Sequence, residues 1–131
     1  MELLDRYIKE VTEDLNITDF NVKESQLRAP ARKHFWVARL INHKIDLERL
    51  EKKKKRITKE IALKLIDSAP MRISVASAEK SVEQTSEIES ISDQISDLKN
   101  LIEYLEKVER IMSSLTFDLG NIIKIIGLEQ T

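Results

Sequence analysis

The sequence predicts an all-α protein built on two long amphipathic helices that form a helical hairpin, with a short helix before them. Only two glycines and two prolines occur in 131 residues, whereas strand-and-turn folds need many tight turns built on such residues. Apolar residues recur at helical spacing through two long stretches of the chain. Charged residues make up 34% and apolar residues 41%, which is typical of chains dominated by long helices. At this length we expect one domain, residues 1–131.

The N-terminal part, residues 1–28, is predicted to hold a short helix followed by a turn. Between residues 2 and 15, apolar side chains recur at helical spacing: Leu3, Leu4, Tyr7, Ile8, Val11 and Leu15. Residues 16–28 hold cap and turn residues. Pro30 suits the first turn of a helix, where its missing N–H has no partner to lose. A long second helix is therefore expected over residues 30–66.

Basic charge is concentrated in this second helix. Residues 28–64 hold 13 basic and 4 acidic side chains, a net charge of +9, whereas residues 1–27 carry −4 and residues 65–131 carry −6. The heptad positions form an apolar seam interrupted by one lysine: Leu40, His43, Leu47, Leu50, Lys54, Ile57 and Ile61. Arg49, Lys52, Arg56 and Lys59 lie three or four residues apart and share the opposite face. A clustered field of this sign attracts polyanions.

Two interpretations of the basic run 52–56 stay open. Its side chains can neutralise phosphates and release counterions, or they can form a solvated helix face. On the first interpretation, the candidate DNA-binding residues are Arg49, Lys52, Lys53, Lys55, Arg56, Lys59, Arg32, Lys33 and Arg39. Phe35 and Trp36 lie among the last three, and a base can stack on an aromatic ring. Because large aromatic side chains usually pack, we favour a role for both in anchoring the helix to a neighbour.

Residues 67–87 are predicted to connect the two long helices. Pro70 stops or kinks the first of them. The segment is rich in serine and small residues, and we expect some helix to return before residue 88. Residues 71–75 are a short, weak candidate for a strand.

The last helix, residues 88–127, has the strongest apolar periodicity. Its heptad positions from Ile88 to Ile126 are apolar except at Glu109 and Thr116, which favours coiled-coil-like packing. A flanking stripe widens the apolar arc beyond what a hairpin can cover, so copies of the same chain are the simplest cover. We predict a homo-oligomer. The predicted contact residues are Ile95, Leu98, Leu101, Ile102, Leu105, Val108, Met112, Leu115, Leu119, Ile122, Ile123 and Ile126.

The sequence shows no catalytic or metal-binding apparatus. The absence of cysteine excludes disulfides and thiolate metal sites and fits a reducing compartment. His34 and His43 fall on different sides of a helix, and no phosphate loop or nucleophile motif is present. We expect a non-enzymatic protein with no cofactor and no metal. The acidic start and the lack of an apolar run of membrane-spanning length predict a cytoplasmic protein without membrane contact.

Several landmarks follow one another in a fixed order along most of the chain. A short N-terminal helix precedes Trp36, which stands near the start of the basic helix, and residues 47–51 (LERLE) lead into the lysine run. Asp93 and Asp97 then form an Asp-rich patch, and residues 120–126 (GNIIKII) close the last helix. With this order and spacing, the chain resembles the UvsY family of recombination mediators from T-even-like bacteriophages.

The resemblance implies a ring-shaped homo-oligomer, a hexamer or heptamer, held together largely through the C-terminal helix. Such proteins bind single-stranded DNA and help a RecA-like recombinase replace single-stranded DNA-binding protein there, in DNA recombination and repair in the host cytoplasm. The family's DNA contacts lie in a Lys-x-Arg motif. Its lysine aligns with Lys59, whereas Ile61 stands at the arginine's place. We therefore expect Arg49, Lys52 and Arg56 to carry much of the binding.

Two other non-enzymatic functions compete with this expectation. A coiled-coil scaffold would use the lysine run only as a solvated face, and its DNA binding would vanish at physiological salt. A holdase chaperone of the prefoldin kind would grip unfolded chains at the tips of a helical hairpin, but it requires strands between the helices.

Overall fold

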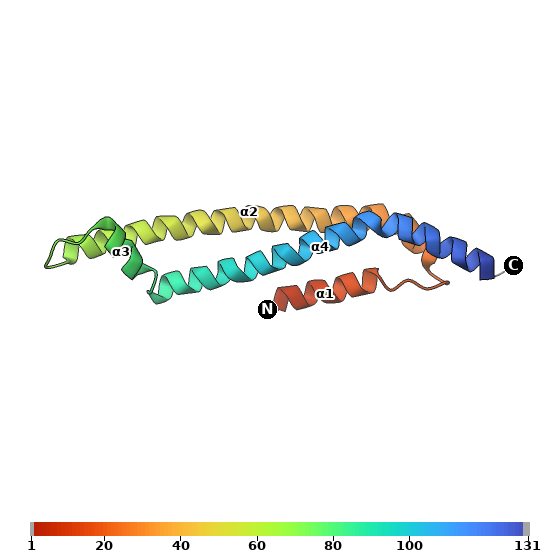
Figure 1. Cartoon of the computed structure of the whole chain (residues 1–131), viewed down its shortest axis with the longest axis horizontal. Helices are drawn as coiled ribbons and strands as arrows, with labels where there is room; N and C mark the ends of the chain where they lie inside the picture. The colour runs from red at the N-terminus through yellow and green to blue at the C-terminus, as the bar shows by residue number, and fades with distance from the viewer. Residues whose placement is uncertain (1, 130–131) are drawn as a thin grey trace. The chain divides into compact units, whose positions relative to one another are not determined.

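The computed structural model describes residues 2–129, which form four helices and no strand. These are α1 (Glu2–Asp14), α2 (Val22–Ser68), α3 (Val75–Val82) and α4 (Ser86–Glu129), as Figure 1 shows. The predicted all-α fold with two long helices is confirmed. The chain divides into two compact units. The hairpin unit is His43–Asn100, and the three-helix unit contains the residues up to Asn42 and those from Leu101 onward.

In the hairpin unit, the C-terminal half of α2 and the N-terminal half of α4 run antiparallel, with α3 between them in the chain (Figure 1). Apolar side chains of the three helices form a single core. Its buried residues are Ala62, Ala78, Val82, Ile88, Ile91 and Ile95. The predicted seam residues Leu47, Leu50, Ile57 and Ile61 pack against this core and are half-buried. The seam was therefore predicted correctly in this unit.

In the three-helix unit, α1, the N-terminal half of α2 and the C-terminal half of α4 contribute the buried side chains. From α1 and α2 these are Tyr7, Val11, Val22, Ala29, Trp36 and Leu40, and from α4 they are Leu101, Ile102, Leu105, Val108, Met112, Leu115 and Leu119. Trp36 is 0% exposed and is among the largest fully buried side chains. The preference for Trp36 as an anchor, rather than as a platform for bases, is confirmed.

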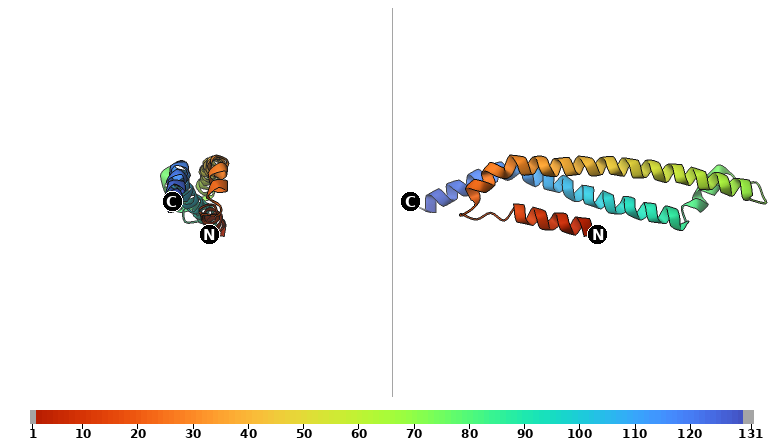
Figure 2. Two further views of the ribbon diagram at one scale, coloured as in Figure 1. Left: turned by 90° about the vertical axis from the view of Figure 1, so that its right-hand side faces the viewer. Right: turned by 180° about the vertical axis from the view of Figure 1, so that it is seen from behind.

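Helix α2 begins at Val22 and not at residue 30, so the predicted boundary is wrong. Pro30 lies inside the helix, where it removes one backbone hydrogen bond and favours a bend. Figure 2 shows the first turns of α2 bent away from the following ones. Burial of Val22 and Ala29 offsets the cost of this proline. Asn21 and Glu24, spaced like the ends of a capping box, were the available signal for the true start.

The remaining boundaries differ from prediction by smaller amounts. Helix α2 ends at Ser68 instead of residue 66, and α4 spans Ser86–Glu129 instead of residues 88–127. The predicted connection 67–87 contains α3, so helix does return before residue 88. The Ser74 hydroxyl caps α3 by accepting a hydrogen bond from the Ser77 amide at 3.2 Å. The weak strand candidate 71–75 is wrong, because its first four residues are not in regular structure and Val75 begins α3.

The buried stripe of α4 changes along the helix. Up to Ile95 it follows the predicted heptad positions. From residue 101 onward the flanking positions Leu101, Val108 and Leu115 are buried in addition to the apolar heptad positions between Ile102 and Leu119, whereas Glu109 is half-buried and Thr116 is exposed. The heptad positions 109 and 116 are polar, and the adjacent Val108 and Leu115 bury apolar groups beside them, so the buried stripe is wider in this part of α4.

Candidate nucleic-acid interface

An exposed stripe of cations follows the outer face of α2 in the hairpin unit. Arg49, Lys52, Arg56 and Lys59 are all exposed, and they share one face because their spacing alternates between three and four residues. At 1.5 Å per residue, the stripe from Arg49 to Lys59 is about 15 Å long. We call these four residues the basic stripe. Lys53 and Lys55 are also exposed, and Lys54, predicted to point at the seam, is half-buried.

The basic stripe forms only weak ion pairs with acidic neighbours. The Lys52 ammonium lies 3.1 Å from Glu48, and the Arg56 guanidinium lies 3.8 Å from Glu60. Both pairs join residues one helical turn apart on a solvent-exposed surface. Such pairs contribute about 0.2–1 kcal/mol. A polyanion can therefore replace these carboxylates at little cost.

The hairpin unit separates its charges between its two long helices. On the α4 side, exposed carboxylates follow one another at Glu87, Glu89, Asp93 and Asp97. The Lys99 ammonium approaches Glu51 of α2 at 3.8 Å. A polyanion is thus attracted to the α2 face of this unit and repelled by the α4 face.

Arg32 and Arg39, in the three-helix unit, are placed very differently. Asp14 Oδ2 accepts hydrogen bonds from Arg32 Nε at 3.0 Å and from Arg32 Nη2 at 2.8 Å. Glu10 Oε2 accepts from Arg39 Nη1 at 2.6 Å. Both arginines are part-buried. They therefore attach α1 to α2 and are not displayed for phosphate binding.

Aromatic rings complete this attachment. Trp36 Nε1 donates to the same Asp14 oxygen at 2.8 Å, and the Tyr7 and Trp36 rings meet edge to face at 5.5 Å. The Arg39 guanidinium lies 4.0 Å from the centre of the Phe35 ring and 4.6 Å from that of Tyr7. The basic and aromatic residues for which base stacking was the alternative to anchoring thus contact one another and Asp14. Lys33 is half-buried on the same stretch of α2.

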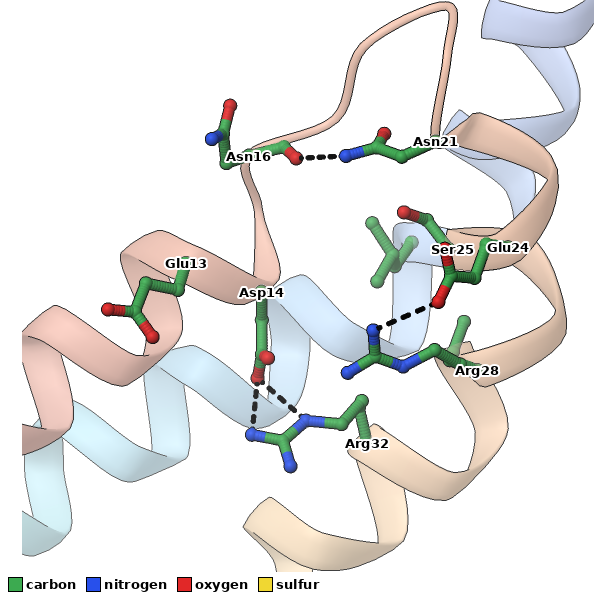
Figure 3. A pocket seen from close by; sticks show the side chains of 10 residues that line it. Glu13, Asp14, Asn16, Asn21, Glu24, Ser25, Arg28 and Arg32 are labelled. Atoms are coloured by element: carbon green, nitrogen blue, oxygen red, sulfur yellow. Dashed lines mark hydrogen bonds and ion pairs between the residues drawn. The ribbon is translucent and has the colours of Figure 1, made fainter.

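A polar pocket of about 260 Å³ lies beside this attachment (Figure 3). It is lined by the end of α1, the connection after it and the first turns of α2. Arg28 approaches Glu24 at 3.7 Å, and Arg32 binds Asp14. Because both arginines already face carboxylates, the pocket does not present the unopposed positive charge that a phosphate site needs. Asn21 Nδ2 donates to the Asn16 carbonyl at 2.9 Å and closes the connection.

Most predicted oligomerisation residues are buried within the chain itself. Ile95, Leu101, Ile102, Leu105, Val108, Met112, Leu115 and Leu119 are all buried, and Leu98, Ile122 and Ile126 are half-buried. Ile123 is the exposed member of the predicted set. The buried eight cannot form a surface for another copy while this packing holds. Sequence periodicity shows that a stripe is covered, but it does not show which helix covers it.

Exposed apolar side chains occur at several places in the chain, and five of them lie in the C-terminal half of α4. Phe117 is 73% exposed and Leu128 is 75% exposed, and Ile111, Ile123 and Ile125 are exposed beside them in the sequence. Ile111, Phe117, Ile125 and Leu128 fall within an arc of about 120° of the helix at about 100° per residue, and we call these four residues the α4 apolar face; Ile123 lies on the opposite side of the helix. By length and composition alone α4 is apolar enough to cross a membrane, but the core helix of a soluble protein passes the same test. Exposed apolar groups that share one face make this part of α4 a candidate contact surface.

Within residues 2–129, no group of three or more His, Cys, Asp or Glu side chains is placed to hold a metal ion. Burial raises the pKa of the Tyr104 phenol, so this hydroxyl stays protonated near neutral pH. The His43 imidazole lies 4.0 Å from Asp46 on the same helix.

Comparison with known proteins identifies no relative of this chain. No protein-family model, curated protein or solved structure matches this chain.

Proposed function

We propose that this chain binds single-stranded DNA and acts as a recombination mediator, promoting the loading of a RecA-like recombinase onto strands covered by single-stranded DNA-binding protein. The observation that carries the proposal is the basic stripe. Four exposed cations on one face of α2 are opposed only by weak surface ion pairs. Lys53 and Lys55 add exposed charge beside them. This part of the chain offers cations to a polyanion without breaking any buried contact.

We leave Arg32 and Arg39 out of the proposed interface. Each would have to release a short, part-buried bond to a carboxylate before it could bind phosphate. Hydrogen bonds to charged groups contribute about 1.5–3 kcal/mol each. Binding phosphate would therefore cost these two arginines the bonds that hold α1 on α2.

Self-association is the second part of the proposal. The α4 apolar face is the surface that we assign to contacts between copies, in a ring of six or seven chains. Repetition of one modest basic stripe around a ring would let linked sites share one strand at high effective concentration. A strand bent on such a ring is partly freed of other proteins, which lowers the cost of nucleating the recombinase filament.

The decisive experiment measures strand binding by fluorescence anisotropy. Labelled oligo-dT is titrated with the wild-type protein and with a variant in which all four stripe residues are changed to alanine, across a salt series. Each phosphate contact contributes about 0.7 to the slope of log affinity against log salt. Because the variant lacks four contacts, we expect its slope of log affinity against log salt to be smaller than that of the wild type by about 3.

A matched control separates position from net charge. Arg6, Lys9, Lys107 and Arg110 are exposed cations outside the basic stripe, so changing them to alanine removes the same charge. We expect this control to keep most of the wild-type affinity and salt slope. Equal losses in both quadruple variants would mean that only net charge matters, and unchanged binding in the stripe variant would remove the basis of the proposal.

The competing functions predict different results. A coiled-coil scaffold would show no oligo-dT binding near physiological salt and no preference for single strands over duplex. For a prefoldin-like holdase the expected strands between the long helices are missing from residues 69–85, which contain α3. Mediation itself is tested by recombinase ATPase activity on oligo-dT covered by single-stranded DNA-binding protein, which the wild type should accelerate and the stripe variant should not.

A further inference from the structure

A groove lies between the last turns of α2 and helix α3 in the hairpin unit. Figure 1 shows α3 beside this end of α2. The groove consists of two adjoining depressions, of about 320 and about 180 Å³, which share Lys59 and Glu79 in their linings. The first is also lined by Lys54, Lys55 and Thr58, and the second by Ala62, Leu63, Ile66 and Val75. We call this feature the α2–α3 groove.

One end of the α2–α3 groove is basic and the other is apolar. At the apolar end Ala62 is buried and Ile66 is half-buried, and both belong to the packing of the hairpin core. Leu63 and Val75 are each 58% exposed. A packed floor with two exposed apolar walls can hold a flat apolar group. The lysines of the other end would lie next to any charge that such a group carries.

The groove continues the basic stripe. Leu63 follows Lys59 by four residues, so it occupies the next position on the face that holds Arg49, Lys52 and Arg56. Lys59 belongs both to the basic stripe and to both depressions. A strand whose phosphates follow the stripe is therefore led to the apolar end of the groove.

We propose that the α2–α3 groove receives an unstacked base of the bound strand, while Lys55 and Lys59 contact the neighbouring phosphates. The proposal rests on the proposed function, and it explains how the DNA-binding site would select single strands over duplex. In a duplex the bases are stacked and paired, so only a single strand can place a base here. The basic stripe alone cannot make this distinction, since both kinds of DNA carry phosphates.

The carboxylates of the groove favour a base over an acidic peptide. Glu51 and Glu79 line it, and a carboxylate can accept hydrogen bonds from the N–H groups of a base edge. The same carboxylates would repel the acidic side chains that the nearby lysines would otherwise attract in a peptide. A base with a flanking phosphate thus fits both signs of charge in the lining.

The test compares oligo-dT with a strand of equal length that lacks the bases. Wild-type protein should bind oligo-dT about tenfold more tightly than the abasic strand, as expected from one stacked base. Val75→Trp fills the apolar end from an exposed position and should make the two affinities nearly equal. Its affinity for the abasic strand should not change. Met71→Trp, at an exposed position outside the groove lining, should leave both affinities as in the wild type.

A second variant guards against misfolding of the first. Leu63→Asn makes the opposite wall polar, and circular dichroism should show wild-type helix content in both variants. If both variants fold and still prefer oligo-dT by the wild-type ratio, the groove does not hold a base. If they keep that preference but lose binding of an Asp-Leu repeat peptide that the wild type binds, the groove belongs to an acidic peptide instead.

Failure of this inference differs from failure of the proposed function. If the fourfold stripe variant loses both strands while Val75→Trp keeps full base preference, strand binding by α2 stands and only the groove assignment falls. If wild-type protein binds neither strand at physiological salt, the proposed function falls and the groove assignment falls with it.

Discussion

Helix α2 presents cations to two very different surroundings. In the three-helix unit, Arg32 and Arg39 face Asp14 and Glu10 and lie against aromatic rings. In the hairpin unit, the basic stripe is exposed, and its ion pairs with Glu48 and Glu60 lie on the solvent-facing surface. Similar residue types on one helix therefore have different roles. A cation that is part-buried and paired with a carboxylate of a second helix stabilises the fold. A cation that lacks such a partner and faces solvent can bind a ligand.

The buried attachment of α1 uses arginine, whereas the exposed run 52–55 beside the basic stripe consists of lysine. The Arg32 guanidinium binds Asp14 through two nitrogens and lies 4.2 Å from the centre of the Phe35 ring, contacts that an ammonium cannot reproduce. The run 52–55 consists of lysines, whose flexible stems and compact charge suit a mobile, sequence-independent contact with phosphate. The contrast predicts opposite mutational behaviour in the two units.

Trp36→Ala should give the largest effect on stability. The indole is fully buried and donates to Asp14, so its removal leaves a cavity and an unfilled acceptor. Replacing a buried Trp by Ala costs about 3–5 kcal/mol. Urea unfolding followed by circular dichroism measures this change. A loss below about 1 kcal/mol would mean that the indole is not packed as described.

Phe117→Glu should have the next largest effect, on association and not on folding. The ring is 73% exposed, so its loss costs the isolated chain little, whereas burying a Phe side chain between copies contributes about 1.5–3 kcal/mol. We expect the molar mass measured by light scattering to fall with helix content unchanged. Thr116→Glu, at the exposed neighbouring position, controls for the added charge. Equal masses for both variants and the wild type would exclude Phe117 from the contact.

Asp14→Asn should destabilise the attachment of α1 by about 1.5–3 kcal/mol, the contribution of hydrogen bonds to a charged group. One Asp14 oxygen accepts bonds from both Arg32 and Trp36, and the amide replaces a charge with a weaker acceptor. Asp97→Asn, at an exposed position of α4, should change stability by no more than about 0.5 kcal/mol. Comparable unfolding midpoints for the two variants would show that Asp14 is not the attachment point of α1.

Sequence patterning predicted the parts of the fold that depend on local periodicity. The hairpin seam at Leu47, Leu50 and Ile57 follows directly from spacing, because amphipathic helices bury one face. The start of α2 was missed because Pro30 was read as a first-turn residue, and the local cost of an internal proline is offset by the burial of Val22 and Ala29. That gain depends on tertiary packing, which periodicity within one segment does not reveal.

The candidate site was predictable only where it is exposed. The basic stripe follows from residue spacing on one helix. The pairing of Arg32 with Asp14 joins residues 18 positions apart, and nothing in either segment alone identifies the other as its partner. The same limit applies to α4, whose widest apolar stretch gave no sign of which face α1 and α2 would cover. Long-range partners decide whether a charged or apolar side chain is free to bind.

The smallest expected effect gives the sharpest test of the comparison between the two units. Arg56→Gln should change the free energy of unfolding by less than about 0.5 kcal/mol, because its ion pair with Glu60 is exposed. It should lower the salt slope of oligo-dT binding by about 0.7, the contribution of one phosphate contact. Arg32→Gln should do the reverse, with a clear loss of stability and an unchanged salt slope.

These two substitutions remove the same charge from the same helix, so net charge cannot explain a difference between them. The outcome depends only on what each guanidinium touches: an exposed glutamate one turn away for Arg56, and a part-buried aspartate of α1 for Arg32. If both variants lost the same amount of salt slope, Arg32 would also contact the strand. The carboxylate of Asp14 would then act as a competitor that DNA displaces, and α1 would have to move when the strand binds.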